Sequence, residues 1–251
     1  MSWQRWIEED VARARGEQQA SAAGYLRGSH RFGEPLPGRA PVRELTADRV
    51  SYARGGRTIL ADVTLSAFAG EAVAVTGPSG SGKSSLLALL AGLEGPDSGS
   101  VRVDGQQLCA QVPDGFGLVL QGYGLVSVLT AAENVEVALQ GRGLSRDEVR
   151  DRAAAALEAV GLGPSADHLV EQLSGGQQQR VATARALAVD PAVLLADEFT
   201  AELDADSRTR MLALVLGVAR RGGLVVIATH DPEVAGACHR EVRLVDGRIP
   251  G

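Results

Sequence analysis

A glycine- and serine-rich stretch of this sequence can bind phosphate groups. GPSGSGKSS follows the strand-like run EAVAVT and opens the helical run SSLLALLAGL, so backbone amides can curl around phosphate oxygens. Lys83 can reach the terminal phosphates of a nucleotide, and the hydroxyl of Ser84 can ligate Mg²⁺. The stretch therefore predicts a nucleotide site formed by Gly77, Pro78, Ser79, Gly80, Ser81, Gly82, Lys83, Ser84 and Ser85.

Two acidic residues end an apolar run further along the chain. The run AVLLADE is typical of a buried parallel strand that delivers carboxylates to the ligand edge of a sheet. Asp197 is placed to hold Mg²⁺, directly or through water, and Glu198 to polarise an attacking water. With the phosphate-binding loop, this pair predicts hydrolysis of a nucleotide.

A second possible anion site lies about a hundred residues after the first. In LSGGQQQR, Ser174, Gly175 and Gly176 precede the helical run QQQRVATARALAV, and the amides of a helix N-terminus attract anions. Gln177 stands three residues after Ser174, so the two can also form a capping box for their own helix. One nucleotide does not obviously need both loops.

The elements that must position these residues alternate between strand and helix. From about residue 42, short apolar runs that resemble strands are interleaved with helical runs, which indicates an α/β fold with a largely parallel sheet. The early strands before EAVAVTG are expected to form an antiparallel edge. The strand-like runs are VRELTADRVSY, EAVAVTG, SVRVDG, GLVLQ, AVLLADE, GLVVIATH and EVRLVDGRI.

Helical patterns replace strands in the middle of the chain, which predicts an inserted helical subdomain over about 122–186. Thr130 and Ser145 each precede a helical run and have a glutamate three residues later, the pattern of a capping box. Gly161 suits the C-terminal end of the second helix. The domain itself is expected to span 42–251.

Residues 1–41 differ from the rest and are expected to form a flexible extension. They are rich in Gly, Pro, Ser and Ala. Trp3, Trp6, Ile7 and Val11 could form one apolar stripe of a helix that meets a partner or a membrane interface. A disordered tail is the alternative interpretation.

Composition limits the class of protein. The 251 residues are 45% hydrophobic but only 4% aromatic, so the core must be aliphatic. The net charge of −6 argues against a broad surface for nucleic acid or anionic lipid. Cys109 and Cys238 lack the spacing of a metal site, and no apolar run approaches the ~18 residues of a membrane span. We therefore expect a cytosolic protein in a reducing compartment.

The order of the motifs resembles that of the ATP-binding cassette (ABC) ATPases. LSGGQQQR is similar to the family's signature, and the other motifs follow the family order from about residue 42 to the C-terminus. They are Tyr52 ahead of the phosphate loop, Gln121 at the start of the helical subdomain, LLADE, the loop ending at Asp204, and His230 after LVVIAT. The resemblance implies a P-loop NTPase (RecA-like) core that takes ATP and Mg²⁺.

The resemblance also implies a use for the second loop. In this family two copies pack head to tail, and the signature loop of one copy closes on the γ-phosphate of ATP in the other. Ser174, Gly175, Gly176 and Gln177 would therefore contact the ATP of a partner copy, which makes a homodimer the expected state. We hypothesise that closure partly exchanges the helix cap of Ser174 for contact with the γ-phosphate.

The remaining motif residues take roles from the same resemblance. His230 would fix the γ-phosphate and Glu198, and Asp204 would lie beside the partner's site. Gln121 would orient the attacking water or ligate Mg²⁺, unless it is a plain surface residue. Tyr52 would stack on adenine, unless it is an ordinary strand tyrosine. His30, His168 and His239 fit no motif.

The loop after Glu198 departs from the family pattern. Phe199 stands where most relatives have proline, and Glu202 stands where asparagine or a small residue is common. The loop therefore loses a restraint on φ and gains a charge. The geometry of this loop is less constrained by the resemblance than that of the ATP site.

The motif set occurs once, and the sequence stops at VDGRIPG. We therefore expect an ATPase subunit that drives a separate membrane permease from the cytoplasmic side of the membrane. QGYGLVSVLTAAENVEVAL and ATHDPEVA are similar to lipoprotein-releasing, macrolide-efflux and cell-division ABC ATPases, which favours an exporter or extruder. Two alternatives are force transmission to an envelope enzyme without transport, and a soluble ABC ATPase acting on DNA or ribosomes. The acidic composition argues against the last.

Overall fold

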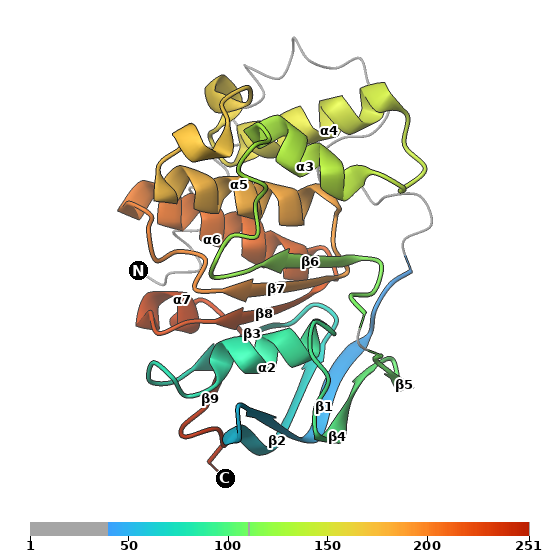
Figure 1. Ribbon diagram of the computed structural model, residues 1–251, viewed down its shortest axis with the longest axis vertical. Helices are drawn as coiled ribbons and strands as arrows, with labels where there is room; N and C mark the ends of the chain where they lie inside the picture. The colour runs from blue at the N-terminus through green and yellow to red at the C-terminus, as the bar shows by residue number, and fades with distance from the viewer. Residues whose placement is uncertain (1–39, 110, 251) are drawn as a thin grey trace.

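An antiparallel sheet forms one edge of the molecule (Figure 1). The computed structural model describes residues 40–109 and 111–250. β1 pairs with β2 on one side and with β4 on the other, and a two-residue β5 completes the order β2-β1-β4-β5. The bounds are Glu44–Arg54 for β1, Arg57–Phe68 for β2, Ser98–Val103 for β4 and Gln106–Gln107 for β5.

A parallel sheet of order β6-β7-β8-β3-β9 forms the centre. Its strands β3, β7 and β8 are buried on both faces, whereas the edge strand β9 is largely exposed. Successive residues of β7 alternate between two cores: Val193 and Leu195 face the core that contains α2, and Leu194 faces the core of the helical layer. This double burial explains the nearly continuous apolar runs of the sequence. The bounds are Ala72–Thr76 for β3, Phe116–Val119 for β6, Val193–Asp197 for β7, Leu224–Ala228 for β8 and Arg240–Arg243 for β9.

Helices cover both faces of the parallel sheet (Figure 1). α2 packs against β7 and β8 on one side and against β1 and β2 on the other, so it joins the two sheets. α5 packs against β6, α6 against β8, and α7 against β3. The bounds are Lys83–Leu90 for α2, Gly175–Ala188 for α5, Ala205–Arg220 for α6 and Pro232–Gly236 for α7.

The chain between β6 and β7 forms a helical layer of α3 (Ala131–Leu139), α4 (Arg146–Ala159) and α5. The capping boxes expected at Thr130 and Ser145 are confirmed, each with both reciprocal hydrogen bonds. Gly161 follows α4 with a φ of 72°, as expected for a helix C-terminal stop. Two short 3₁₀ segments, Gly163–Ser165 and Val170–Gln172, connect α4 to α5.

The expected fold class is confirmed, with one difference in the sheet arrangement. The antiparallel part is a separate four-stranded sheet, because β4 and β5 join the early strands instead of the parallel sheet. No helix within 40–109 and 111–250 is long and apolar enough to cross a bilayer. The apolar stripe expected at Trp3, Trp6, Ile7 and Val11 lies outside the described residues.

Candidate nucleotide and magnesium site

The phosphate-binding loop connects β3 to α2 in a conformation that needs glycine. Gly77, Gly80 and Gly82 have φ values of 144°, 77° and 104°. A Cβ on Gly77 would collide with the backbone carbonyl of Leu244. The loop is therefore held tightly against the chain that follows β9, and its backbone shape is fixed by the fold.

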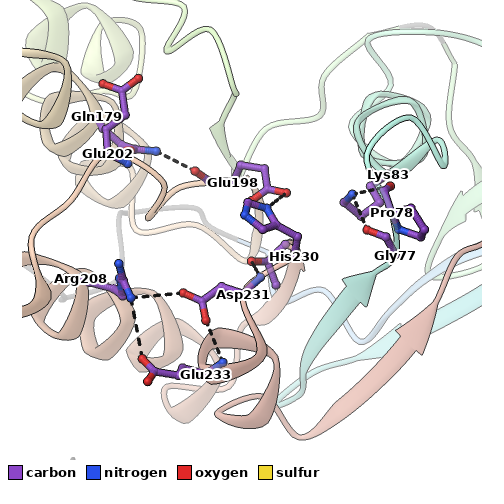
Figure 2. A network of polar contacts seen from close by, with 11 residues as sticks. Gly77, Pro78, Lys83, Gln179, Glu198, Glu202, Arg208, His230, Asp231 and Glu233 are labelled. Carbon is purple, nitrogen blue, oxygen red and sulfur yellow. Dashed lines mark hydrogen bonds and ion pairs between the residues drawn. The ribbon is translucent and has the colours of Figure 1, made fainter.

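Lys83 is the first residue of α2 and lies inside the loop. Its Nζ donates hydrogen bonds to the carbonyl oxygens of Gly77 at 3.0 Å and Pro78 at 3.2 Å, and only 8% of the residue is exposed (Figure 2). The fold thus places a cation where the backbone amides of a helix N-terminus also point. This combination is suited to the terminal phosphates of a nucleotide.

Asp197 and Ser84 form a site that fits Mg²⁺. Burial raises the pKa of Asp197, whereas a hydrogen bond with Ser84 and the charge of Lys83 lower it. The Oδ1 atom of Asp197 is buried and has no hydrogen-bond partner within the described residues. A free carboxylate oxygen beside a hydroxyl is the donor set that Mg²⁺ accepts alongside phosphate oxygens and water.

Glu198 and His230 form a polar pair at the ends of two neighbouring strands. Glu198 follows β7, His230 lies two residues beyond β8, and Nδ1 of His230 lies 2.9 Å from the carboxylate of Glu198 (Figure 2). Glu198 has a left-handed φ of 48°, and its amide donates to the carbonyl of Ala228 at 2.9 Å. The backbone is thus turned sharply while remaining tied to β8, which fixes where the carboxylate lies.

The loop after His230 is braced by interactions that sequence reasoning missed. The carboxylate of Asp231 accepts a hydrogen bond from the amide of Glu233 at 2.8 Å and lies 3.5 Å from Arg208 of α6. Arg208 also lies 3.8 Å from the carboxylate of Glu233 (Figure 2). These contacts hold the start of α7, and with it the residue next to His230, against α6.

Gln179 is a second residue that sequence reasoning missed. Its Nε2 donates to the carbonyl of Glu198 at 2.9 Å, and its Oε1 accepts from the amide of Glu202 at 3.2 Å (Figure 2). The side chain is buried, so α5 is joined directly to the residue that carries the candidate catalytic carboxylate. A polar side chain on the buried face of α5 was the available signal, but its partners are distant in sequence.

The second predicted anion site begins α5, and its expected capping box is confirmed. The Oγ of Ser174 accepts from the amide of Gln177 at 3.3 Å, and Oε1 of Gln177 accepts from the amide of Ser174 at 2.9 Å. Gly175 and Gly176 lie directly against Glu202 of the loop before α6: a Cβ on Gly175 would meet the movable carboxylate of Glu202, and one on Gly176 would lie 2.7 Å from its backbone carbonyl. The cap belongs to the protomer itself.

Comparison with known proteins decides the family. The family described as ABC transporter matches residues 60–201. The chain belongs to the ABC transporter family. The bacterial ABC transporter cassette MJ0796, solved as a dimer, superposes with a TM-score of 0.77 at 36% identity, covering 82% of this chain and 97% of that one. The same cassette is also known in a post-hydrolysis state with ADP and Pi, again at a TM-score of 0.77.

Two similar curated proteins are named as macrolide export proteins. The macrolide export ATP-binding/permease protein MacB 1/2 of Paracoccus denitrificans (strain Pd 1222) is 47% identical over 199 residues, which are 76% of this chain and 30% of that protein. MacB 1 of Yersinia pestis bv. Antiqua (strain Antiqua) is 43% identical over 220 residues, 84% of this chain and 34% of that protein. The chain spans about a third of the length of these relatives.

The loop after Glu198, which departs from the family pattern, is anchored by a buried side chain. Phe199 is 1% exposed and packs in the core of the helical layer, so burial of its side chain anchors the loop. Asp204 caps α6 by accepting from the amide and the hydroxyl of Ser207 at 2.8 and 2.9 Å. These hydrogen bonds, the backbone one foremost, lower the pKa of Asp204.

The positions of Gln121 and Tyr52 do not by themselves establish a role in nucleotide binding. Gln121 is exposed just beyond β6, and within the described residues no hydrogen bond links it to Ser84 or Asp197. Tyr52 lies on β1 opposite Leu60 and is 9% exposed. A Cβ on Gly82 would lie 2.8 Å from Leu60, so Tyr52 is one strand away from the phosphate loop. The roles of both in nucleotide binding stay predictions.

Proposed function

We propose that this chain binds ATP with Mg²⁺, hydrolyses it in a head-to-tail homodimer, and drives a membrane permease of the exporter type. The observation that carries the proposal is the Glu198–His230 pair beside the Asp197–Ser84 pair and Lys83. Together these provide a water-activating group, a candidate metal site and a phosphate-binding cation at one edge of a parallel sheet.

Each residue of the site has a distinct task in this reaction. Lys83 and the loop amides bind the phosphates, and Ser84, Asp197 and Gln121 would hold Mg²⁺, which neutralises charge that develops on the phosphate oxygens. Glu198 accepts the proton of the attacking water, and His230 holds the carboxylate in place. Catalysis is chiefly positioning and electrostatic stabilisation, which suits a site fixed by strand ends.

The two anion-binding loops of one chain serve two different nucleotides in this proposal. ATP held by one copy is closed over by Ser174, Gly175, Gly176 and Gln177 of the other, with Asp204 beside the interface and Tyr52 against adenine. A two-fold axis repeats the contact, so two ATP molecules are enclosed together. The related cassette solved as a dimer supports this arrangement.

Ser174→Ala is expected to weaken ATP-driven dimerisation and to lower the free energy of unfolding by about 1 kcal/mol, because it removes both the proposed γ-phosphate contact and the helix cap. Sedimentation with ATP and denaturant unfolding measure the two effects. Ser145→Ala is the matched control, because Ser145 forms the same capping box on α4. Equal dimerisation of the two variants would contradict the hypothesis that closure exchanges the cap for phosphate.

The proposed partner is a permease, and the chain acts at the cytoplasmic side of the membrane. The relatives are named ATP-binding/permease proteins for macrolide export, which favours export for this chain. The net charge of −6 gives no support to a nucleic-acid partner. The transported compound depends on the permease.

Exposed valines mark where the permease would dock. Val126 and Val128 follow Gln121 before α3, and Val137 lies on α3; all three are large apolar side chains that face solvent. Apolar side chains exposed beside a nucleotide-sensing glutamine suit contact with a cytoplasmic helix of the partner. Nucleotide state would then reach the permease through this surface.

Val128→Asp is expected to reduce recovery of the permease at least ~10-fold, because an unpaired carboxylate would be buried on docking. Val128 is 71% exposed, so the folded chain tolerates the change. Phe68→Asp is the control, since Phe68 is 50% exposed on β2 in the antiparallel sheet. Co-purification from membranes measures the difference, and equal loss in both variants would refute this docking surface.

An affinity pull-down tests the partner class. Tagged Glu198→Gln protein is incubated with detergent-solubilised membranes, ATP and Mg²⁺, and bound proteins are identified by mass spectrometry. Recovery of a polytopic permease supports export. A partner with few spans and a large extracytoplasmic domain would instead indicate force transmission to an envelope enzyme. Recovery of ribosomal or DNA-associated proteins alone would overturn the membrane role.

A further inference from the structure

Glu202 folds back over the start of the signature helix α5. Its carboxylate lies so close to Gly175 that a Cβ on Gly175 would collide with Oε2, and its carbonyl oxygen would lie 2.7 Å from a Cβ on Gly176. Its amide donates to Gln179 at 3.2 Å (Figure 2). The loop before α6 and the first turn of α5 therefore pack as one unit, with a carboxylate at the helix N-terminus.

Tyr123 joins a third segment to the same carboxylate. Burial, a hydrogen bond with Glu202 and the charge of Glu202 raise the pKa of Tyr123 to about 12. The backbone of Tyr123 has a left-handed φ of 59°, and its carbonyl accepts from Arg185 of α5 at 2.7 Å. Glu202 thus connects the segment after Gln121 to the signature helix.

The position of Glu202 conflicts with the proposed approach of a phosphate. In the head-to-tail dimer, the γ-phosphate of the partner's ATP arrives at the first turn of α5, where helix amides favour a negative charge. A carboxylate that already lies at that helix end repels the incoming phosphate. A two-fold dimer repeats this repulsion at both sites.

We propose that Glu202 is an autoinhibitory acidic latch that opposes ATP-driven closure. In the open protomer it lies at the N-terminus of the signature helix and ties that helix to Tyr123. Closure on the partner's ATP displaces the carboxylate and breaks its link to Tyr123, whose carbonyl stays bonded to Arg185 of α5. The inference rests on the proposed head-to-tail dimer and adds a residue that sets how readily the dimer forms.

Glu202→Gln in the Glu198→Gln background tests the latch. The substitution keeps the size of the side chain and removes its charge. The dissociation constant of the dimer with ATP and Mg²⁺ is expected to fall about 10-fold, because a like-charge repulsion near the protein surface is lost. Sedimentation velocity measures it at about 0.05 M and about 0.5 M salt, where screening differs strongly. The advantage of the variant is expected to shrink at high salt, an effect that a purely structural role would not produce.

Glu94→Gln supplies the matched control, because Glu94 is an exposed acid beyond the far end of α2 and its loss changes net charge equally. Tighter dimers in Glu202→Gln but not in Glu94→Gln support the latch. Unchanged or weaker dimers in Glu202→Gln overturn it while leaving the proposed function standing. Failure of the Glu198→Gln parent itself to dimerise with ATP would instead overturn the head-to-tail dimer, and the latch with it.

Discussion

Replacing Glu198 by glutamine is expected to lower ATP turnover at least ~100-fold, the usual effect of removing a general base. Glutamine keeps the size of the side chain and can still hydrogen-bond Nδ1 of His230, which lies 2.9 Å from the carboxylate of Glu198 in the parent protein. The left-handed backbone at residue 198 and the hydrogen bonds to Ala228 and Gln179 involve main-chain atoms, so they persist. Only the acceptor of the water proton is lost.

Steady-state phosphate release measures this effect, and equilibrium binding of labelled ATP shows whether the site remains intact. ATP affinity is expected to stay within a few-fold of the parent, because Glu198 acts on the water and not on the phosphates. Glu94→Gln, which removes an exposed acid beyond α2, is expected to retain parental turnover. Near-normal hydrolysis by Glu198→Gln would refute the assignment of this carboxylate.

Replacing Lys83 by alanine is expected to weaken ATP binding about 100-fold, because charge-assisted hydrogen bonds to the phosphates are lost. The ammonium group is already held within the loop by the carbonyls of Gly77 and Pro78, so little reorganisation precedes binding. Calorimetric titration with ATP measures the change. Stabilisation of the folded chain by ATP in thermal unfolding provides an independent measure of affinity.

A chemical test avoids the substitution altogether. Lys83 is the only lysine of the 251-residue sequence. An amine-reactive reagent can therefore modify only this side chain and the N-terminal amine, and mass spectrometry separates the two. ATP with Mg²⁺ is expected to protect Lys83 and to leave the N-terminal amine reactive. Equal labelling of Lys83 with and without ATP would contradict its role at the phosphates.

Local sequence was enough to predict the elements that carry the site. The phosphate loop needs glycines at fixed positions between a strand and a helix, and the capping boxes at Thr130, Ser145 and Ser174 depend on residues only three positions apart. The alternation of apolar runs with helical runs reflects a sheet buried on both faces. These features are visible in a sequence because each is set within one turn or one strand.

The missed features depend on contacts between distant segments. Gln179 meets the carbonyl of Glu198, and Arg208 meets Asp231, across gaps of about twenty residues each. The pairing of β4 with β1 instead of the parallel sheet is likewise a long-range choice. The substitution at residue 202 was visible in the sequence, but its contact with Gly175 needed the fold.

The central claim is that two copies of this chain share two ATP molecules between their phosphate loops and signature helices. Sedimentation equilibrium of the Glu198→Gln protein with ATP and Mg²⁺, combined with a count of bound ATP, tests it most directly. The account predicts a particle of twice 26.1 kDa that holds one ATP per chain, and its dissociation when ATP is removed. A species that remains at 26.1 kDa with ATP bound would contradict it.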